Sequence, residues 1–405
     1  MKVNGTYKRY DHQDEILERD EFLDTLNTIF KKSRWFGVAP RRRSLLFIWA
    51  IINAVLMMAV EAGAIWKLIR AITGTVFNTA GGHSLVARLS GSIFYANGLL
   101  SLALSWRLIT SWSSVHSYWI KTELNRSLFL PPDVHIKKRV IFITSLVVTC
   151  ALGEHILSMI SAIGFRCPPS EYMEKYILVS HGFLIHKNEY HIWLAIPIFI
   201  VSKTATVLWN FQDLIIILLS TGLTSRYKRL NSYVKNLVEI EQSQEMKKHA
   251  NEIYIEVQTW RRVREAYIHQ ANLVRRVSNK LGALILLSSL NNFYFICLQL
   301  FLGINKDKGE MINRLYHFLS LSWLMLRASG VALVGADVDE HSRKALKYMK
   351  MCSNHNVEIE RLKNQMKNDR VVLRGLGFFA LDRNMFLKVA AAIMKYELVL
   401  VQYDK

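Results

Sequence analysis

Polar and ionisable side chains interrupt several long apolar stretches of the 405-residue sequence. Glu154 and His155 are the clearest case, because they lie about midway along one stretch. An ionisable group inside a membrane span costs at least about 2.5 kcal/mol, so its presence indicates a function. One interpretation places the two side chains on a water-filled pocket. The alternative is a structural ion pair between this carboxylate and Lys203 or Arg327.

Amide, phenol and indole groups gather at the adjoining ends of two later stretches. Tyr294 and Gln299 come near the end of the first, where they either bond ligand hydroxyls or bond neighbouring helices. Tyr316, Ser320 and Trp323 begin the second with i, i+4, i+7 spacing, which puts them on one helix face. Tyr316 also fits an aromatic belt at the membrane interface, whereas Trp323 lies deeper and fits a belt less well.

Sugars are suited to such a surface, because their axial C–H faces stack on aromatic rings and their hydroxyls need many donors and acceptors. If the helices splay outward, these side chains face one cavity in the extracellular half of the protein. The predicted ligand-binding residues are His155, Trp193, Tyr294, Gln299, Tyr316, His317 and Trp323.

The last apolar stretch, residues 385–403, carries charges that lipid would reject. Lys395, Val399 and Gln402 share one helix face at i, i+4, i+7 spacing, and Val399 and Tyr403 share the adjacent face. Such a helix suits a bundle interior or a pore wall. The alternative is a packed helix whose lysines extend to the membrane surface. The predicted pore and gate residues are Val399, Gln402 and Tyr403.

These residues must be held by membrane-spanning helices. Hydrophobic residues make up 51% of the sequence and charged residues 21%, against about 25% charged in soluble domains. The apolar residues form blocks of about 20, enough for a helix to cross about 30 Å of hydrocarbon. This pattern excludes a soluble enzyme and predicts an all-α membrane protein. Its seven expected transmembrane helices are residues 44–66, 89–106, 140–165, 192–223, 281–304, 315–336 and 385–403.

The distribution of basic residues predicts the orientation. Lysines and arginines number 35 on the side that carries the amino terminus and nine on the other, and basic loops stay in the cytoplasm. We therefore expect a cytoplasmic amino terminus and an extracellular carboxyl terminus, the reverse of a G-protein-coupled receptor. This asymmetry accounts for the net charge of +20, so no nucleic-acid partner is expected. Because the sequence has no Walker loop, GxGxxG, HExxH, GxSxG or CxxC motif, we expect neither a cofactor nor a metal site nor enzymatic activity.

A carboxyl-terminal motif reads Lys395-Tyr396, then Glu-Leu-Val-Leu-Val, then Gln402-Tyr403. Other distinctive runs lie at residues 209–214, 260–267, 291–300 and 375–383. With these motifs the chain resembles insect gustatory receptors, and within them the sugar-receptor group. The hallmark of that family is Thr-Tyr, five mostly apolar positions and Gln-Phe. Lysine and tyrosine therefore stand here where the family has threonine and phenylalanine.

The resemblance implies a ligand-gated cation channel in the plasma membrane of gustatory receptor neurons, either homotetrameric or built with related gustatory receptor subunits. The final helices of four subunits surround the pore, membrane lipid surrounds the bundle, and each subunit has its own extracellular-facing sugar pocket. Two alternatives are a receptor for another tastant, such as fructose or a bitter compound, and an accessory subunit without current of its own. The expected organisation is a cytoplasmic amino-terminal segment (1–43), a six-helix transmembrane ligand-binding bundle with long cytoplasmic helices at about 225–276 (44–336), and a cytoplasmic anchor with the pore-lining final helix (337–405).

Overall fold

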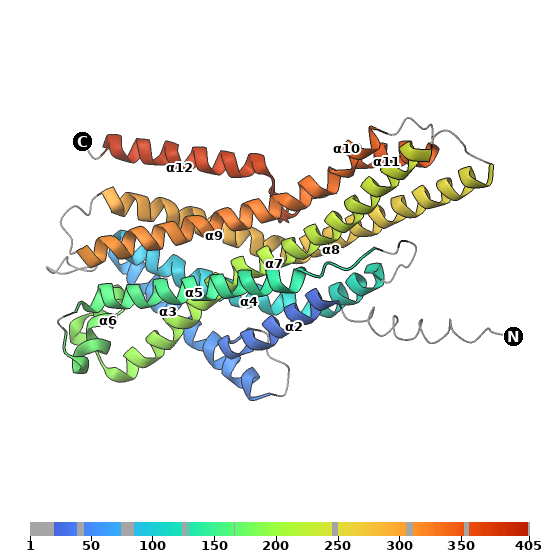
Figure 1. Cartoon of the computed structure of the whole chain (residues 1–405). Helices are drawn as coiled ribbons and strands as arrows, with labels where there is room; N and C mark the ends of the chain where they lie inside the picture. Colours follow the sequence, from blue (N-terminus) through green and yellow to red (C-terminus); the bar gives the residue numbers. More distant parts are fainter. Residues whose placement is uncertain are drawn as a thin grey trace.

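The computed structural model describes residues 20–38, 44–73, 85–123, 128, 130–165, 167–244, 250–304, 311–351 and 356–403, and these are almost entirely helical (Figure 1). The main helices are α2 (Glu21–Ser33), α3 (Leu45–Ile72), α4 (Leu85–Glu123), α5 (Ile136–Ile163), α6 (Tyr172–Ser180), α7 (Ile192–Gln244), α8 (Ala250–Ile304), α9 (Met311–Arg343), α10 (Ala345–Met349), α11 (Val357–Asn368) and α12 (Arg383–Tyr403). Three short 3₁₀ helices, η1 (Arg34–Phe36), η2 (Pro169–Glu171) and η3 (Lys187–Glu189), and two antiparallel strands, β1 (Arg374–Gly375) and β2 (Phe379–Ala380), complete the described chain.

Helix α7 is the central element of the bundle. It packs against α3, α4, α5, α6, α8 and α9. The six consecutive residues 214–219 are all buried. A helix that is apolar on every side is stable only when other helices surround it, which explains its central position.

The expected membrane spans are present as helices. Six helices of the described chain are long and apolar enough to cross a membrane, namely Leu45–Ile72, Leu85–Thr122, Ile136–Ile163, Ile192–Gln242, Val257–Gly303 and Met311–Met349. The seventh expected span is also a helix, α12, but Lys388, Lys395 and Glu397 make it less apolar than the other six. The prediction of an all-α membrane protein is confirmed, although the helices are longer than their apolar parts.

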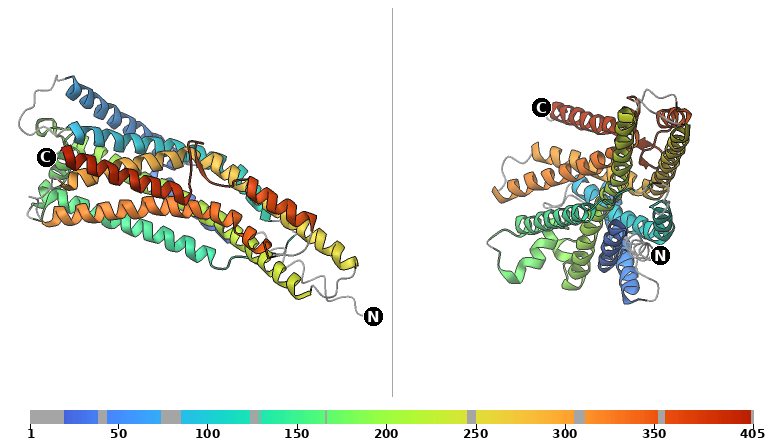
Figure 2. Two further views of the ribbon diagram at one scale, coloured as in Figure 1. Left: turned by 90° about the horizontal axis from the view of Figure 1, so that it is seen from above. Right: turned by 45° about the vertical axis from the view of Figure 1, so that its right-hand side comes forward.

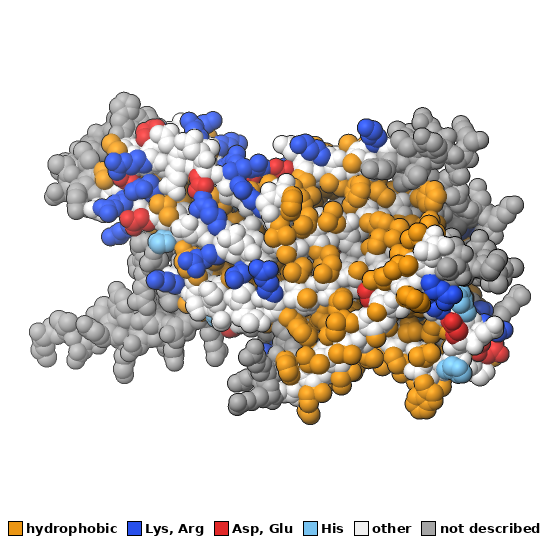
Figure 3. Space-filling model, turned by 180° about the vertical axis from the view of Figure 1, so that it is seen from behind, with side chains coloured by type: hydrophobic (Ala, Val, Ile, Leu, Met, Phe, Trp, Pro, Cys, Tyr) orange, Lys and Arg blue, Asp and Glu red, His pale blue; other side chains and the backbone are white. Residues whose placement is uncertain are grey.

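The bundle has two chemically different ends. α6 lies at one of them, which we call the α6 end (Figure 1). α7 and α8 extend past the apolar region to the other end, where α10 packs against α7 and α11 packs against α8. We call this the α11 end. Lysine and arginine side chains gather toward the α11 end, whereas hydrophobic side chains cover much of the remaining surface in Figure 3.

Helix α2 is packed into the bundle rather than standing apart from it. Asp20 caps it by accepting from the backbone N–H of Phe22 at 3.0 Å. The Phe22 ring stacks on Trp119 of α4 with centroids 5.1 Å apart. Gly222 of α7 makes this contact possible, because a Cβ atom there would lie 2.4 Å from the Phe22 ring. The described part of the segment predicted at 1–43, residues 20–38, therefore contributes to the core.

A β-hairpin positions the start of α12. The backbone N–H of Arg374 donates to Ser278 Oγ at 3.0 Å, which fastens β1 to α8. Gly282 lets the hairpin approach, since a Cβ atom there would lie 3.1 Å from the backbone nitrogen of Leu376. Leu376 and Gly377 have positive φ angles of 49° and 84° in the turn between the strands, a conformation that favours glycine. Beyond the hairpin, α12 lies at the edge of the bundle (Figure 2).

Candidate functional site

A chain of hydrogen bonds joins α5, α8 and α9 in the apolar region of the bundle. Ser320 Oγ donates to Glu154 Oε1 at 2.8 Å, and Gln299 Nε2 donates to Ser320 Oγ at 3.1 Å. The three helices α5, α8 and α9, which hold most of the predicted ligand-binding residues, therefore meet through polar side chains. We call Glu154, Ser320 and Gln299 the hydroxyl-binding cluster, because carboxylate, hydroxyl and amide groups are the partners that sugar hydroxyls need.

Among the described residues, several polar side-chain atoms on the same three helices are buried without a hydrogen-bond partner. They include Gln299 Oε1, His155 Nε2 and Trp323 Nε1. Tyr316, one turn from Ser320 on α9, neighbours Ser158 and Ser320. Buried polar groups are normally paired, since leaving one unpaired costs about 1–3 kcal/mol. These groups are consequently available to a bound molecule.

The other predicted ligand residues occupy different surroundings. His317 packs on Gly303 of α8, where a Cβ atom would lie 2.7 Å from its Nε2. The half-buried Tyr294 ring contacts Phe295 edge to face, with centroids 5.1 Å apart. Trp193, in the first turn of α7, is 82% exposed. Gln299 and Tyr316 thus lie at one polar centre, Trp323 follows Ser320 by one turn on α9, and the exposed Trp193 side chain is directed away from the bundle.

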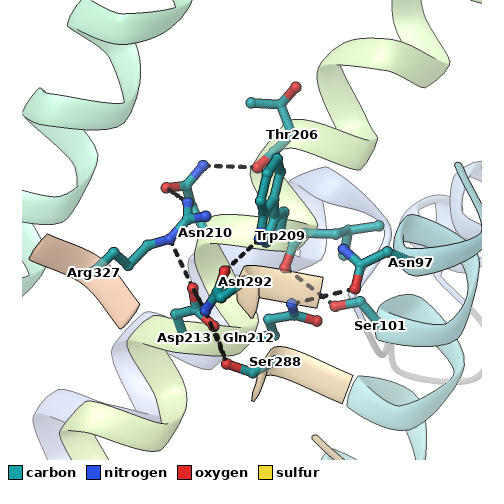
Figure 4. A network of polar contacts seen from close by, with 11 residues as sticks. Asn97, Ser101, Thr206, Trp209, Asn210, Gln212, Asp213, Ser288, Asn292 and Arg327 are labelled. Atoms are coloured by element: carbon teal, nitrogen blue, oxygen red, sulfur yellow. Dashed lines mark hydrogen bonds and ion pairs between the residues drawn. The ribbon is translucent and has the colours of Figure 1, made fainter. Parts of the chain in front are cut away.

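A second polar network, built from buried side chains, links α7, α8 and α9 (Figure 4). Arg327 Nε is 2.7 Å from Asp213 Oδ2, and Arg327 Nη1 donates to Asn210 Oδ1 at 2.5 Å. Ser288 Oγ donates to Asp213 Oδ1 at 2.5 Å, and Asn292 Nδ2 donates to Asp213 Oδ2 at 3.2 Å. The aspartate therefore receives hydrogen bonds at both oxygens, which offsets part of the cost of burying it.

Trp209 completes this network. Its indole N–H donates to Asn292 Oδ1 at 3.1 Å, and its ring lies 4.7 Å below the Arg327 guanidinium carbon. The Arg327 guanidinium therefore pairs with Asp213, and within the described structure it forms no ion pair with Glu154. An ion pair between Glu154 and Lys203 is not formed either: the carboxylate bonds Ser320, and the lysine bonds a tyrosine. In the sequence, the signal for the pair of Asp213 with Arg327 was the presence of one acidic and one basic residue in two different predicted spans.

The base of α12 is tied to α9 and to the segment before the hairpin. Leu381 packs on Gly335 of α9, where a Cβ atom would lie 2.6 Å from the leucine. Arg383 pairs with Glu340 of α9, and Arg370 pairs with Asp382. Burial opposes ionisation of Asp382, but the Met385 backbone N–H and the Arg370 guanidinium outweigh it and lower its pKa.

The helix attached in this way, α12, is the one that was predicted to carry the gate. Asp382 Oδ1 accepts from the Met385 N–H at 2.7 Å and so caps the first turn of α12. The predicted pore residues Val399, Gln402 and Tyr403 lie in the last turns of the helix, and their side chains are outside the described part of the structure. Their placement stays a prediction.

Similarity to known proteins covers almost the whole chain. A family model described as "Trehalose receptor" matches residues 37–405. The chain belongs to the trehalose receptor family. The predicted membership in the sugar group of insect gustatory receptors is confirmed with it.

Relatives in Drosophila melanogaster agree with this assignment. The receptor is 29% identical over 330 residues to the gustatory receptor for sugar taste 64a, covering 78% of this chain and 69% of the relative. It is 26% identical over 320 residues to the gustatory receptor for sugar taste 64f, covering 77% of this chain and 65% of that protein. It is 29% identical over 272 residues to the gustatory receptor 5a for trehalose, covering 66% of this chain and 58% of that one.

The fold of the receptor is also found in a solved structure. The insect olfactory receptor OR5 from Machilis hrabei superimposes with a TM-score of 0.66, at 11% sequence identity, over 95% of this chain and 100% of that one. The same olfactory receptor in complex with eugenol gives a TM-score of 0.63. At this low identity the likeness establishes a shared fold.

Proposed function

We propose that this chain is a sugar receptor of gustatory neurons that works as a ligand-gated cation channel, with a pore formed by α12 of four subunits. The proposal places the α11 end in the cytoplasm and the α6 end outside the plasma membrane. Subunits of the channel are copies of this chain or related gustatory receptors. Two relatives are named for sugar taste and one for trehalose, which supports a sugar as the ligand.

The observation that carries the proposal is the hydroxyl-binding cluster with its unpaired neighbours. Ser320 connects Glu154 to Gln299, while Gln299 Oε1 and Trp323 Nε1 have no partner. A sugar hydroxyl both donates and accepts, so it can bond a carboxylate and an amide at once. Trp323, one turn after Ser320 on α9, carries a ring that would offer a stacking face for the sugar C–H groups.

The position of α12 supports a pore between subunits. Within one subunit the helix packs mainly on α8 and α9. Leu387 and Met394 of α12 are 64% and 62% exposed. A helix with an uncovered apolar side at the edge of a subunit has room for contacts with neighbouring subunits. Its base is bound to α9, which carries Ser320, so movement of α9 upon ligand binding can be passed to α12.

Current recordings from cells that express only this chain test the proposal. The panel contains glucose, trehalose, sucrose, maltose, fructose and one bitter compound. We expect a cation current with at least one sugar other than fructose and an increase of about fivefold or more in the half-maximal concentration with Ser320→Ala, because the variant removes two hydrogen bonds. Ser322→Ala changes an exposed serine of the same helix and serves as the matched control.

Three outcomes contradict parts of the proposal. A response to fructose or the bitter compound alone assigns the receptor to another tastant. Current that appears only when a related subunit is co-expressed makes this chain an accessory subunit. An unchanged dose response in Ser320→Ala, at normal surface expression, removes the hydroxyl-binding cluster from the ligand site.

A further inference from the structure

A half-buried lysine, Lys203, lies near the α6 end and has no carboxylate partner among the described residues. Lys203 is about three turns into α7. Its ammonium donates to the Tyr176 hydroxyl of α6 at 2.9 Å and lies 4.4 Å and 4.3 Å from the ring centroids of Tyr176 and Phe199. Within the described part of the chain, its partners are thus one phenol and two aromatic faces. An ammonium in such surroundings is costly unless an anion compensates it.

Neighbouring helices do not supply that anion. The carboxylate of Glu154 accepts from Ser320 at 2.8 Å, and that of Glu61 on α3 accepts from Ser92 at 2.8 Å. Neither forms an ion pair with Lys203 in the structure as described. Within the described part of the chain, no carboxylate therefore pairs with this charge.

Two imidazoles with unpaired nitrogens lie near this ammonium. His181, 6% exposed, shares a hydrogen bond of 3.2 Å between its Nδ1 and the Tyr95 hydroxyl, and its Nε2 is buried without a partner. Burial first, and then the Lys203 charge, lower the pKa of His181 to about 3, so the ring is neutral. When Tyr95 donates to Nδ1, the proton sits on Nε2 and forms an unpaired donor. His155 Nε2 is likewise buried and unpaired.

The segment after α6 encloses this group from the α6 end. His181 and residues 183–185 are buried in the bundle. The Phe183 ring lies against α4 at Gly91, where a Cβ atom would be 2.3 Å away. Lys203, Tyr176, His181 and His155 therefore form a built site rather than a surface patch. We call it the Lys203 site.

The Lys203 site adjoins the hydroxyl-binding cluster. His155 directly follows Glu154 on α5, and the same lysine charge acts on this imidazole. Tyr176, the partner of Lys203, also interacts electrostatically with Tyr316 of α9. A single small molecule can consequently contact a cation with donor groups at one end and hydroxyl-binding groups at the other.

We propose that Lys203 binds the carboxylate of a sugar acid whose hydroxyl-bearing carbons occupy the hydroxyl-binding cluster, so that the receptor recognises aldonates and uronates as well as neutral sugars. This inference rests on the proposed sugar-receptor function and adds a second ligand class. The compensating anion is a carboxylate carried by a polyol, because a lone small anion would leave the adjoining hydroxyl-binding groups unused.

The test compares gluconate with glucose, which share the same carbon chain length. Dose responses are recorded at constant sodium and osmolarity, and melting temperatures of the purified full-length chain are measured with each compound. We expect Lys203→Met to raise the half-maximal concentration of gluconate about tenfold or more and that of neutral sugars less than about threefold, because a charge-assisted hydrogen bond is lost. Lys203→Arg keeps the response to gluconate, and Lys175→Met is the matched control on α6.

The outcomes separate this inference from the proposed function. If neutral sugars activate the wild type while gluconate and glucuronate neither activate it nor shift its melting temperature, the sugar-acid inference is overturned and the sugar receptor stands. If acetate acts as gluconate does, a bare carboxylate suffices and the inference fails. Equal weakening of gluconate and neutral sugars in Lys203→Met also overturns it. If Lys203→Met does not reach the cell surface, Lys203→Arg and the wild-type comparison of gluconate with acetate still decide.

Discussion

Arg327 of α9 holds Asp213 of α7 in an ion pair of 2.7 Å, with side chains 3% and 0% exposed. This contact connects the central helix to the helix that carries Ser320. Ser320 and Arg327 are seven residues apart, about two helical turns, so both lie on the face of α9 that points into the bundle. The same packed face of α9 therefore positions both the hydroxyl-binding cluster and the ion pair.

Removing one partner of this pair should destabilise the receptor strongly. Arg327→Met leaves the Asp213 carboxylate buried and uncompensated, which costs about 3–5 kcal/mol in comparable buried pairs. We expect loss of surface expression and a large fall in the melting temperature of the detergent-solubilised protein. Arg314→Met, which changes an exposed arginine of the same helix, should leave both unchanged.

The double variant Asp213→Leu with Arg327→Met tests the cause. Removing both charges leaves no uncompensated ion, so the double variant should be more stable than Arg327→Met alone. A double variant that melts as low as the single one would mean that the pair acts through packing instead of charge.

Ligand stacking is predicted at Trp323. Trp323→Ala should remove a stacking face worth about 1 kcal/mol beyond area burial, which corresponds to about a fivefold increase in the half-maximal sugar concentration. Dose responses at matched surface expression measure it. The exposed Trp66 of α3 provides a control substitution to alanine that should have no effect. If the dose response does not move in Trp323→Ala, the pocket lies elsewhere.

Much of the helical fold could be predicted from apolar stretches and their polar continuations. The span at 192–223 and the polar helix that follows form one helix, α7. The packing of Phe22 on Trp119 could not be predicted, because an amphipathic segment does not specify which helix it packs against. Helix α6 was missed for a different reason: it has only 9 residues and lies within a connection between two spans.

The candidate site could be predicted only in part. Side-chain spacing shows which residues share a helix face, but it does not show how far two packed helices are shifted along each other. Tyr316, Ser320 and Trp323 share a face, as their spacing indicates, and Ser320 meets Glu154. Pairing of Arg327 with Asp213 instead of Glu154 depends on how far α9 is shifted along α5 and α7, and no local pattern encodes that shift. Lys203 was visible as an intramembrane charge, but its hydrogen-bond partner Tyr176 comes from α6, which the sequence pattern did not predict.

The stability at the α11 end should depend on pH through Glu358. Burial opposes its ionisation, but hydrogen bonds of 2.7 Å from Arg264 and from Arg361 outweigh it and lower its pKa. A carboxyl group with a lowered folded-state pKa stabilises the fold above its unfolded value of about 4.3, and this contribution is lost as the pH falls through the folded-state pKa.

Glu358→Gln should therefore lower the melting temperature at pH 7 by about 2 °C, and the difference from the wild type should shrink below about pH 4.3. Thermal unfolding of the solubilised protein from pH 7 to pH 3.5 measures this dependence. Glu360→Gln, at an exposed carboxylate of the same helix, is the control. A difference that is the same at every pH would exclude an ionic origin.

The proposed orientation predicts that tags at the two chain ends stain differently. Basic residues gather toward the α11 end, whereas α12 begins about midway along the bundle and runs toward the α6 end (Figures 1 and 3). In unpermeabilised cells an antibody should reach a carboxyl-terminal tag and not an amino-terminal one. Permeabilised cells, in which both tags must stain, are the control. Surface staining of the amino-terminal tag would reverse the topology and remove the basis of the proposed pore.

The last prediction concerns the gate. Four copies of α12 around an axis would form an apolar ring at Val399 and a polar aromatic ring at Gln402 and Tyr403. An apolar constriction closes a channel by excluding water, and ligand binding must then stabilise the open arrangement more than the closed one. Tyr403 carries a hydroxyl that the family's phenylalanine lacks, so the closed ring is easier to wet.

Three substitutions follow from this arrangement, and current recordings measure each. Tyr403→Phe should lower the sugar-independent current, because it removes the hydroxyl that admits water, and Val399→Ala should raise it by widening the apolar ring. Gln402→Ala should change ion preference without moving the sugar dose response. In Val399→Cys and Gln402→Cys, thiol reagents should alter the current in the open state, while the parent with its four cysteines should not respond. If both cysteines are untouched and the three substitutions conduct like the parent, α12 does not line the pore.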